Sequence, residues 1–117
     1  MDERRRSTRY PVVDLEIQLK EERTPVGQVV NLSQGGLLVF CEKPLKKGSL
    51  HQFRVPFNKT VAGKIHFDFE GRVVWSNINV DAPKMHSMGI EFIKYPTIQS
   101  EFIQRMINQF GDEQTPQ

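Results

Sequence analysis

The stretch VDLEIQL, residues 13–19, alternates apolar and polar side chains at every position. Successive side chains of a β-strand point to opposite faces, so this pattern is typical of a strand with one dry face. The strand should begin near Pro11 and end at the charged turn EERTPVG, residues 21–27. We therefore predict that one set of side chains faces a core: Val13, Leu15, Ile17 and Leu19.

Further apolar stretches follow along the chain, each bounded by turn residues. GLLVFCE, residues 36–42, is a continuous apolar run, which is typical of a strand buried on both faces. VAGKIHFDF (61–69) and GRVVWSN (71–77) predict two strands joined near Gly71, and NVDAPKMH (79–86) predicts a polar loop. Six or seven short strands with close turn signals indicate a sandwich or a small barrel.

The pattern changes near the C-terminus. Apolar residues recur there at steps of three and four, which predicts an amphipathic helix that starts at Pro96 or Thr97 and ends at Gly111. We expect its apolar stripe to pack on the barrel, and a partner or self-association surface is the alternative. The stripe consists of Ile98, Phe102, Ile103, Met106, Ile107 and Phe110.

Length and composition limit the classes to which the protein can belong. The 117 residues fit one domain, and 38% hydrophobic with 26% charged residues is the balance of a globular chain. A net charge of +2 provides no general attraction for nucleic acid. The single cysteine, Cys41, cannot form an internal disulfide. We see no signal peptide and no membrane-spanning run, so we expect a cytoplasmic protein without a membrane partner.

No catalytic constellation is visible in the sequence. Nucleophile, P-loop and dinucleotide motifs are absent, and no histidine stands at metal-ligand spacing from a cysteine or from another histidine. We therefore predict a protein that is not an enzyme and that has neither a metal nor a catalytic cofactor. The three histidines are dispersed along the chain: His51, His66 and His86.

Two polar stretches are not explained by strand formation, ERRRSTRYPV at residues 3–12 and NLSQGG at residues 31–36. NLSQGG can be a plain turn, an idle glycosylation sequon or a ligand-binding turn. In the third interpretation Asn31 and Ser33 face the same way on an extended backbone, and Gly36 lets a flat ligand approach the main chain.

A hairpin could bring the arginine cluster and NLSQGG to the same rim. Arginine pairs bidentately with phosphate, forks onto the O6 and N7 acceptors of guanine and stacks on flat rings. Asparagine and serine can both donate hydrogen bonds to a base edge and accept them from it, whereas arginine can only donate. The combination fits a guanine nucleotide that carries phosphate charge.

Together the two stretches form a known pattern. R-x-x-x-R at residues 5–9, followed by N-x-S-x-x-G at residues 31–36, resembles the signature of the PilZ domain family. EGRVVW (70–75) and MGIEF (88–92) are similar to later strand motifs of that family. The resemblance extends from Glu3 to about Phe110, and the two-part signature is more specific than either half.

The resemblance implies an all-β fold, a six-stranded antiparallel split β-barrel with a C-terminal α-helix. It also implies a bacterial cytoplasmic receptor for the second messenger cyclic di-GMP. The expected organisation is a flexible arginine-rich ligand-binding arm at residues 1–10, the barrel at 11–95, the helix packed on it at 96–111 and a disordered tail at 112–117.

The resemblance also implies a role for each signature residue. Arg5 and Arg9 clamp phosphates and guanine edges, Asn31 and Ser33 bind a guanine, and Gly36 allows close approach. Trp75 packs beside the ligand or is simply a barrel aromatic. An arginine at the position of Arg4 implies binding of a stacked pair of cyclic di-GMP molecules. The signal should pass to an unidentified effector protein in trans.

Two other functions compete with this hypothesis. A basic arm and strand aromatics are also features of a small barrel that binds single-stranded nucleic acid. The acidic residues between those aromatics and the low net charge argue against it, so we expect no nucleic-acid partner. The third hypothesis is a PilZ-like interaction domain that has lost its ligand. The aromatics in question are Phe53, Phe67, Phe69 and Trp75.

Overall fold

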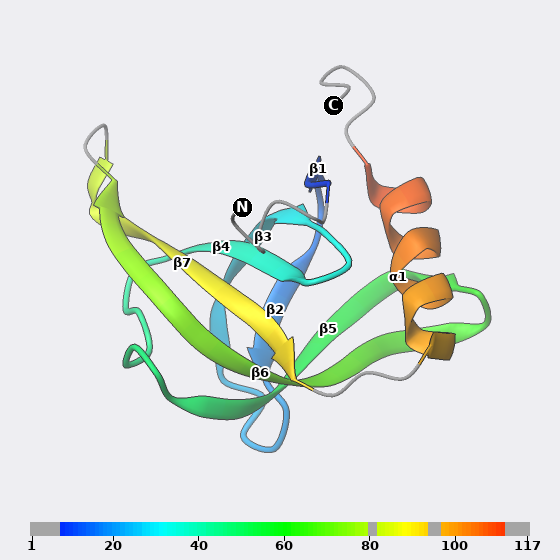
Figure 1. Ribbon diagram of the computed structural model, residues 1–117, viewed down its shortest axis with the longest axis horizontal. Coiled ribbons are helices and arrows are strands. Elements are labelled where there is room, and N and C mark those ends of the chain that lie inside the picture. Colours follow the sequence, from blue (N-terminus) through cyan, green and yellow to red (C-terminus); the bar gives the residue numbers. More distant parts are fainter. Residues whose placement is uncertain (1–7, 80–81, 94–96, 112–117) are drawn as a thin grey trace.

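The computed structural model describes residues 8–79, 82–93 and 97–111. Within these ranges the chain forms seven strands and one helix (Figure 1). In chain order they are β1 (Tyr10–Pro11), β2 (Glu16–Leu19), β3 (Pro25–Leu32), β4 (Gly36–Cys41), β5 (Leu50–Val61), β6 (Lys64–Asn79), β7 (Ala82–Ile93) and α1 (Thr97–Phe110).

Six of these strands close into an antiparallel barrel. They pair in the order β3, β2, β5, β6, β7 and β4, and the pairing of β4 with β3 closes the ring. The two-residue strand β1 is added to β3. Helix α1 lies beside β5 at one side of the barrel (Figure 1). The predicted six-stranded antiparallel barrel with a C-terminal helix is thus confirmed.

The first predicted strand is interrupted in the structure. Val13, which was expected to face the core, is 48% exposed, whereas its neighbour Val12 is 5% exposed. Asp14 adopts a positive φ of 64°, which breaks the period-two pattern between β1 and β2. Leu15 and Ile17 are buried as predicted. The predicted alternation of buried and exposed side chains is therefore correct after Asp14. Before Asp14 the buried position is shifted by one residue, from Val13 to Val12.

The other corrections concern strand bounds and faces. Gly71 does not join two strands but lies inside the continuous strand β6, and the predicted loop at residues 79–86 is strand from Ala82 onward. Strand β4 is not buried on both faces, because Leu38 and Phe40 are only half-buried. Sequence periodicity located these segments, but it could not show that strand β6 continues through Gly71 without a turn.

The barrel core contains a cluster of phenylalanines, in which Phe53, Phe67 and Phe69 stack and Phe92 meets Phe69 edge-on. The ring centroid of Phe69 lies 5.3 Å from those of Phe53 and Phe67, and 4.9 Å from that of Phe92. All four side chains are buried, so these rings are not available on the surface. Gly71 lies against this cluster, since a Cβ added there would be 3.0 Å from the Phe69 ring and 2.6 Å from Cγ2 of Ile90.

Helix α1 packs its apolar stripe onto the barrel. Ile103, Met106 and Ile107 are buried, and the ring of Phe57 from β5 lies between Phe102 and Phe110, with centroid distances of 6.1 and 5.8 Å. Gly111, the predicted last residue, follows the helix, and its N–H donates to the Ile107 carbonyl at 2.8 Å. The stripe therefore serves the intramolecular core.

We expect Gly71→Ala to lower the free energy of unfolding by about 1–3 kcal/mol, because the added methyl group overpacks a core that has no free space at this point. Urea denaturation followed by circular dichroism measures this change. Gln52→Ala on the exposed face of β5 is the control and should change the stability by less than about 0.5 kcal/mol. Equal stability of the two variants would contradict the assigned packing of Gly71.

The Asp68 carboxylate on β6 lies within ion-pair distance of three basic side chains. Arg54 contacts both oxygens of Asp68, with Nε–Oδ1 at 2.8 Å and Nη2–Oδ2 at 2.9 Å. His66 Nδ1 lies 3.2 Å from Oδ1, and Lys20 Nζ lies 3.8 Å from Oδ2. Partial burial by itself raises the pKa of Asp68, but the Arg54 hydrogen bond and the nearby positive charges bring that pKa below its ordinary value.

This lowered pKa predicts a specific acid dependence of stability. The stabilisation that ionised Asp68 provides is present above the unfolded-state pKa of about 3.9 and is lost as the pH falls through the lower folded-state pKa. Asp68→Asn should therefore be less stable than the wild type at pH 7, and the difference should shrink as the pH falls below the unfolded-state pKa of about 3.9. Denaturation curves across this range measure it, and a constant difference would contradict the assignment.

Candidate functional site

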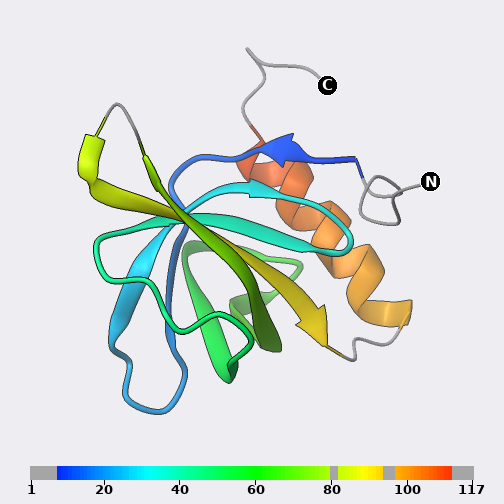
Figure 2. The same ribbon diagram turned by 60° about the vertical axis from the view of Figure 1, so that its left-hand side comes forward.

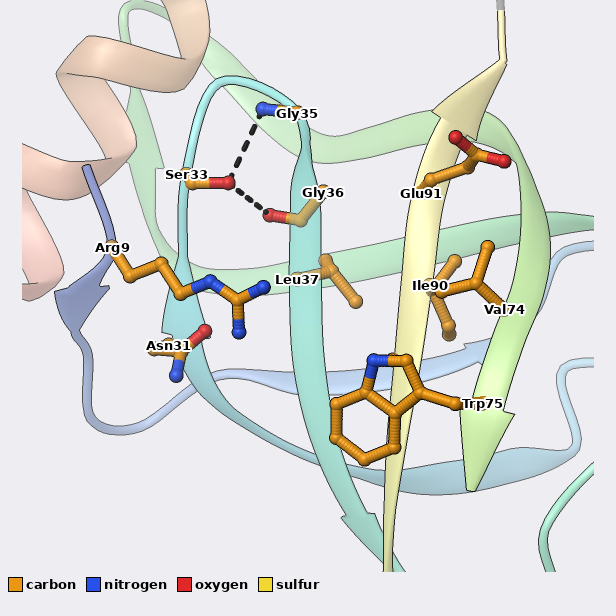
Figure 3. A pocket seen from close by; sticks show the side chains of 11 residues that line it. Arg9, Asn31, Ser33, Gly35, Gly36, Leu37, Val74, Trp75, Ile90 and Glu91 are labelled. Carbon is orange, nitrogen blue, oxygen red and sulfur yellow. Dashed lines mark hydrogen bonds between the residues drawn. The ribbon is translucent and has the colours of Figure 1, made fainter. Parts of the chain in front are cut away.

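A surface cleft lies where β3, β4, β6 and β7 run side by side (Figure 3). Its volume is about 260 Å³. Five of its lining residues were predicted to belong to the site, namely Arg9, Asn31, Ser33, Gly36 and Trp75. The remaining lining residues are Gly35, Leu37, Val74, Gly89, Ile90 and Glu91.

The pairing of β1 with β3 positions Arg9. Pro11 pairs with Asn31 and Tyr10 pairs with Leu32, so Arg9 comes next to the turn that follows β3. Figure 3 shows the Arg9 guanidinium beside Asn31, directed over the cleft. Arg9 is exposed and Asn31 is half-buried. Two residues that are 22 positions apart in the sequence therefore present their polar groups to the same space.

Ser33 holds the turn between β3 and β4. Its side chain is buried, its Oγ donates to the Gly36 carbonyl at 3.2 Å and accepts from the Gly35 N–H at 3.2 Å. The Ser33 N–H also donates to the Gly36 carbonyl at 2.9 Å. The single hydroxyl proton is thus used within the turn, and a further contact of Ser33 would use an acceptor lone pair.

The structure gives Gly36 a packing role. An added Cβ would lie 2.1 Å from the Ile90 carbonyl oxygen and 2.9 Å from the Glu91 Cα, both in the main chain of β7. A side chain at Gly36 would therefore separate β4 from β7, which pair here through Gly36 and Glu91. Glycine at position 36 thus permits the close approach of the neighbouring strand β7.

Trp75 is turned toward the cleft by a bulge in β6. The register with β7 shifts between Val73 and Trp75, so that Val73 pairs with Ile90 and Trp75 with Gly89. The half-buried indole lies against Gly89, where an added Cβ would be 2.5 Å from Nε1. The ring packs on the barrel and also lines the cleft, and its packing beside a ligand stays a prediction.

The predicted site residues Arg4 and Arg5 lie outside the described residues. Sequence reasoning did not assign Glu91 to the site, although it lies within the quoted motif MGIEF. Its Oε1 is 3.6 Å from Nε of Arg72, and both side chains are close to half exposed. The described lining of the cleft therefore carries one positive and one negative side chain, Arg9 and Glu91.

The walls of the cleft are connected to helix α1. Gln34, next to Ser33 in the turn, donates from Nε2 to the Ser100 carbonyl at 3.1 Å, and Ser100 Oγ donates to Gln34 Oε1 at 2.9 Å. At the other end of the helix, the N–H of Val13 donates to the Phe110 carbonyl at 3.0 Å. Figure 2 shows the β3–β4 turn and β1 both next to α1, which thus contacts both segments that form the site.

Comparison with protein families gives a match over most of the chain. Residues 3–109 match the PilZ domain. The chain belongs to the PilZ domain family. This confirms the resemblance inferred from the residues 5–9 and 31–36. No protein in a search of curated sequences matches this PilZ domain closely enough to count as a relative.

Solved structures share the fold of this PilZ domain at low sequence identity. The PilZ domain of YcgR from Escherichia coli with c-di-GMP is 18% identical with a TM-score of 0.66, and the match covers 92% of each chain. The K. pneumonia MrkH–c-di-GMP complex (13%, TM-score 0.70) and the Bacillus subtilis inhibitor of motility MotI/DgrA (19%, TM-score 0.70) match over 93% and 92% of this chain. These matches cover 53% of the MrkH chain and 51% of the MotI/DgrA chain.

Two other features are absent from the described part of the PilZ domain. No three His, Cys, Asp or Glu side chains gather there as a metal site. No described helix has the length and apolar character needed to cross a membrane.

Gly89→Ala should displace the Trp75 indole from its place in the cleft, because the new methyl group would overlap the ring. Trp75 is the only tryptophan in the sequence, so its fluorescence reports this site alone. We expect a shifted emission maximum with a retained β-sheet circular dichroism spectrum. Ser87→Ala, two residues earlier on β7, is the control, and an unchanged emission of Gly89→Ala would contradict the packing described here.

Proposed function

We propose that this PilZ domain is a bacterial, cytoplasmic receptor for cyclic di-GMP. The observation that carries the proposal is the convergence of Arg9, Asn31 and Ser33 on one cleft with the order and spacing of the family signature. The YcgR PilZ domain and MrkH structures contain c-di-GMP, which supports the same ligand class here.

The chemistry of the cleft fits this ligand. The Arg9 guanidinium can pair with a phosphate or fork onto guanine O6 and N7. The Asn31 side chain offers both a donor and an acceptor to a base edge, and the Ser33 hydroxyl keeps an acceptor lone pair. The exposed part of the Trp75 indole gives a flat apolar surface on which a base or a guanidinium can stack.

The arginine arm supplies the rest of the proposed site. Arg5 joins Arg9 in clamping phosphates and guanine edges, and Arg4 allows a stacked pair of ligand molecules. Ligand binding orders the arm over the cleft, and the charge-assisted contacts offset the entropy lost on ordering. We assign no catalytic role to any of these residues.

Signalling then passes to an effector protein in trans. Gln34 in the β3–β4 turn and Val13, two residues after β1, form hydrogen bonds to opposite ends of α1, so a change at the cleft alters the same helix from both of its ends. A ligand that binds one arrangement of these segments better than another shifts the population toward that arrangement. The effector recognises the surface that the bound arrangement presents.

The nucleic-acid hypothesis is less well supported. Phe53, Phe67 and Phe69 were its candidate stacking residues, and their side chains are between 0% and 6% exposed. A base could reach these rings only if the core opened. Among the four aromatics considered, Trp75 alone lies at the surface cleft.

Calorimetric titration with cyclic di-GMP tests the proposed function. The wild type should bind, and Arg5→Ala and Arg9→Ala should each weaken binding by about tenfold or more, because each removes charge-assisted hydrogen bonds. Arg4→Ala should change the stoichiometry, and Arg6→Lys should bind almost as the wild type does. Arg105→Ala, an exposed arginine on α1, is the matched control.

Three results would count against this function. Absence of heat from the wild type would favour the ligand-free interaction domain. Equal binding by the wild type, Arg5→Ala and Arg9→Ala would place the ligand elsewhere on the molecule. Salt-sensitive binding of oligonucleotides that cyclic di-GMP does not displace would favour the nucleic-acid hypothesis.

A further inference from the structure

The charge of Glu91 is unexpected in a cleft proposed for an anionic ligand. Glu91 lines the cleft, and its side chain is 49% exposed. Each phosphate of a cyclic dinucleotide carries a negative charge, which a nearby carboxylate repels. A carboxylate in this place therefore lowers the affinity unless the ligand also brings hydrogen-bond donors to it.

The strand register leaves the Glu91 carboxylate accessible. On one side Glu91 pairs with Gly36, which has no side chain, and on the other side it pairs with Arg72. Its Oε1 lies 3.6 Å from Nε of Arg72, and both side chains are close to half exposed. Such exposed ion pairs contribute little free energy, so the carboxylate can give up the contact with Arg72 and accept hydrogen bonds from a ligand instead.

Guanine offers the donors that fit a carboxylate. Its Watson–Crick edge presents N1–H and the N2 amino group next to each other, and two carboxylate oxygens can accept from both at once. The neighbouring groups in the cleft serve other parts of the ligand. Arg9 carries only donors, and the Asn31 amide offers one neutral acceptor.

We infer that Glu91 is a specificity-determining residue that accepts hydrogen bonds from guanine N1–H and N2–H. This inference rests on the proposed cyclic di-GMP function and adds a residue to that site. Glu91 supplies the negatively charged acceptor that asparagine at position 31 does not provide. Arg72 Nε, at 3.6 Å, places a positive charge beside this carboxylate.

Glu91→Gln tests this role with two ligands. Glutamine keeps the size but places an N–H₂ donor where the second oxygen accepted, so it cannot accept from both guanine donors. The second ligand is cyclic di-IMP, whose hypoxanthine bases lack the N2 amino group. Calorimetry should show cyclic di-GMP binding weakened about tenfold or more in Glu91→Gln, and cyclic di-IMP binding weakened less. The preference for guanine over hypoxanthine should therefore decrease.

Glu101→Gln on α1 is the matched control, because it removes the same charge from an exposed position that does not line the cleft. It should keep the wild-type affinities and the wild-type preference. Since Glu91 is exposed, both variants should melt at similar temperatures. Comparison of their melting curves shows whether a loss of binding comes from the site itself or from unfolding of the protein.

The possible outcomes separate this inference from the proposed function. Wild type that binds neither dinucleotide overturns both. Wild type that binds cyclic di-GMP, together with Glu91→Gln that shows the same affinity and the same guanine preference, overturns the role of Glu91 alone. Tighter binding by Glu91→Gln also overturns it, because the carboxylate would then act only as a repulsive charge.

Discussion

The position of Asn31 in the sheet determines the arrangement of the site. It pairs with Pro11 of β1 on one side and with Leu38 of β4 on the other. The first pairing brings Arg9 next to the β3–β4 turn, and the second places that turn against β7. Each pairing depends on the register of the other strand, because a shift by one residue would turn every side chain to the opposite face. The closed barrel fixes this register.

The packing of small residues provides the space that the cleft occupies. Gly36 lets β4 and β7 approach closely, and Gly89 accommodates the indole of Trp75. The Ser33 hydroxyl closes the turn between these strands. The same groups that join the strands thus line the cleft. Substitution at these positions should therefore change the stability of the fold as well as the shape of the cleft.

Much of this fold follows from local patterns, and the exceptions have physical causes. Periodicity predicted the strands and the helix because burial of one face is a local property of an amphipathic segment. It failed at Val13, where the positive φ of Asp14 shifts the phase. It also failed at Gly71, because glycine marks a turn in many sequences and here accommodates core rings contributed by distant strands. The spacing of Arg9, Asn31 and Ser33 predicted that they meet. Glu91 could not be assigned in advance, since a glutamate on a strand usually faces solvent.

The central claim is that the arginine arm and the β3–β4 turn form one site for cyclic di-GMP. Chemical-shift mapping of the ¹⁵N-labelled protein with this ligand tests it most directly. We predict that the largest shifts fall on the Arg9 side chain, the Gly35 amide and the Trp75 indole N–H, all of which line the cleft. An unchanged spectrum, or shifts confined to the region around Lys20 and Asp68, which do not line the cleft, would contradict the account.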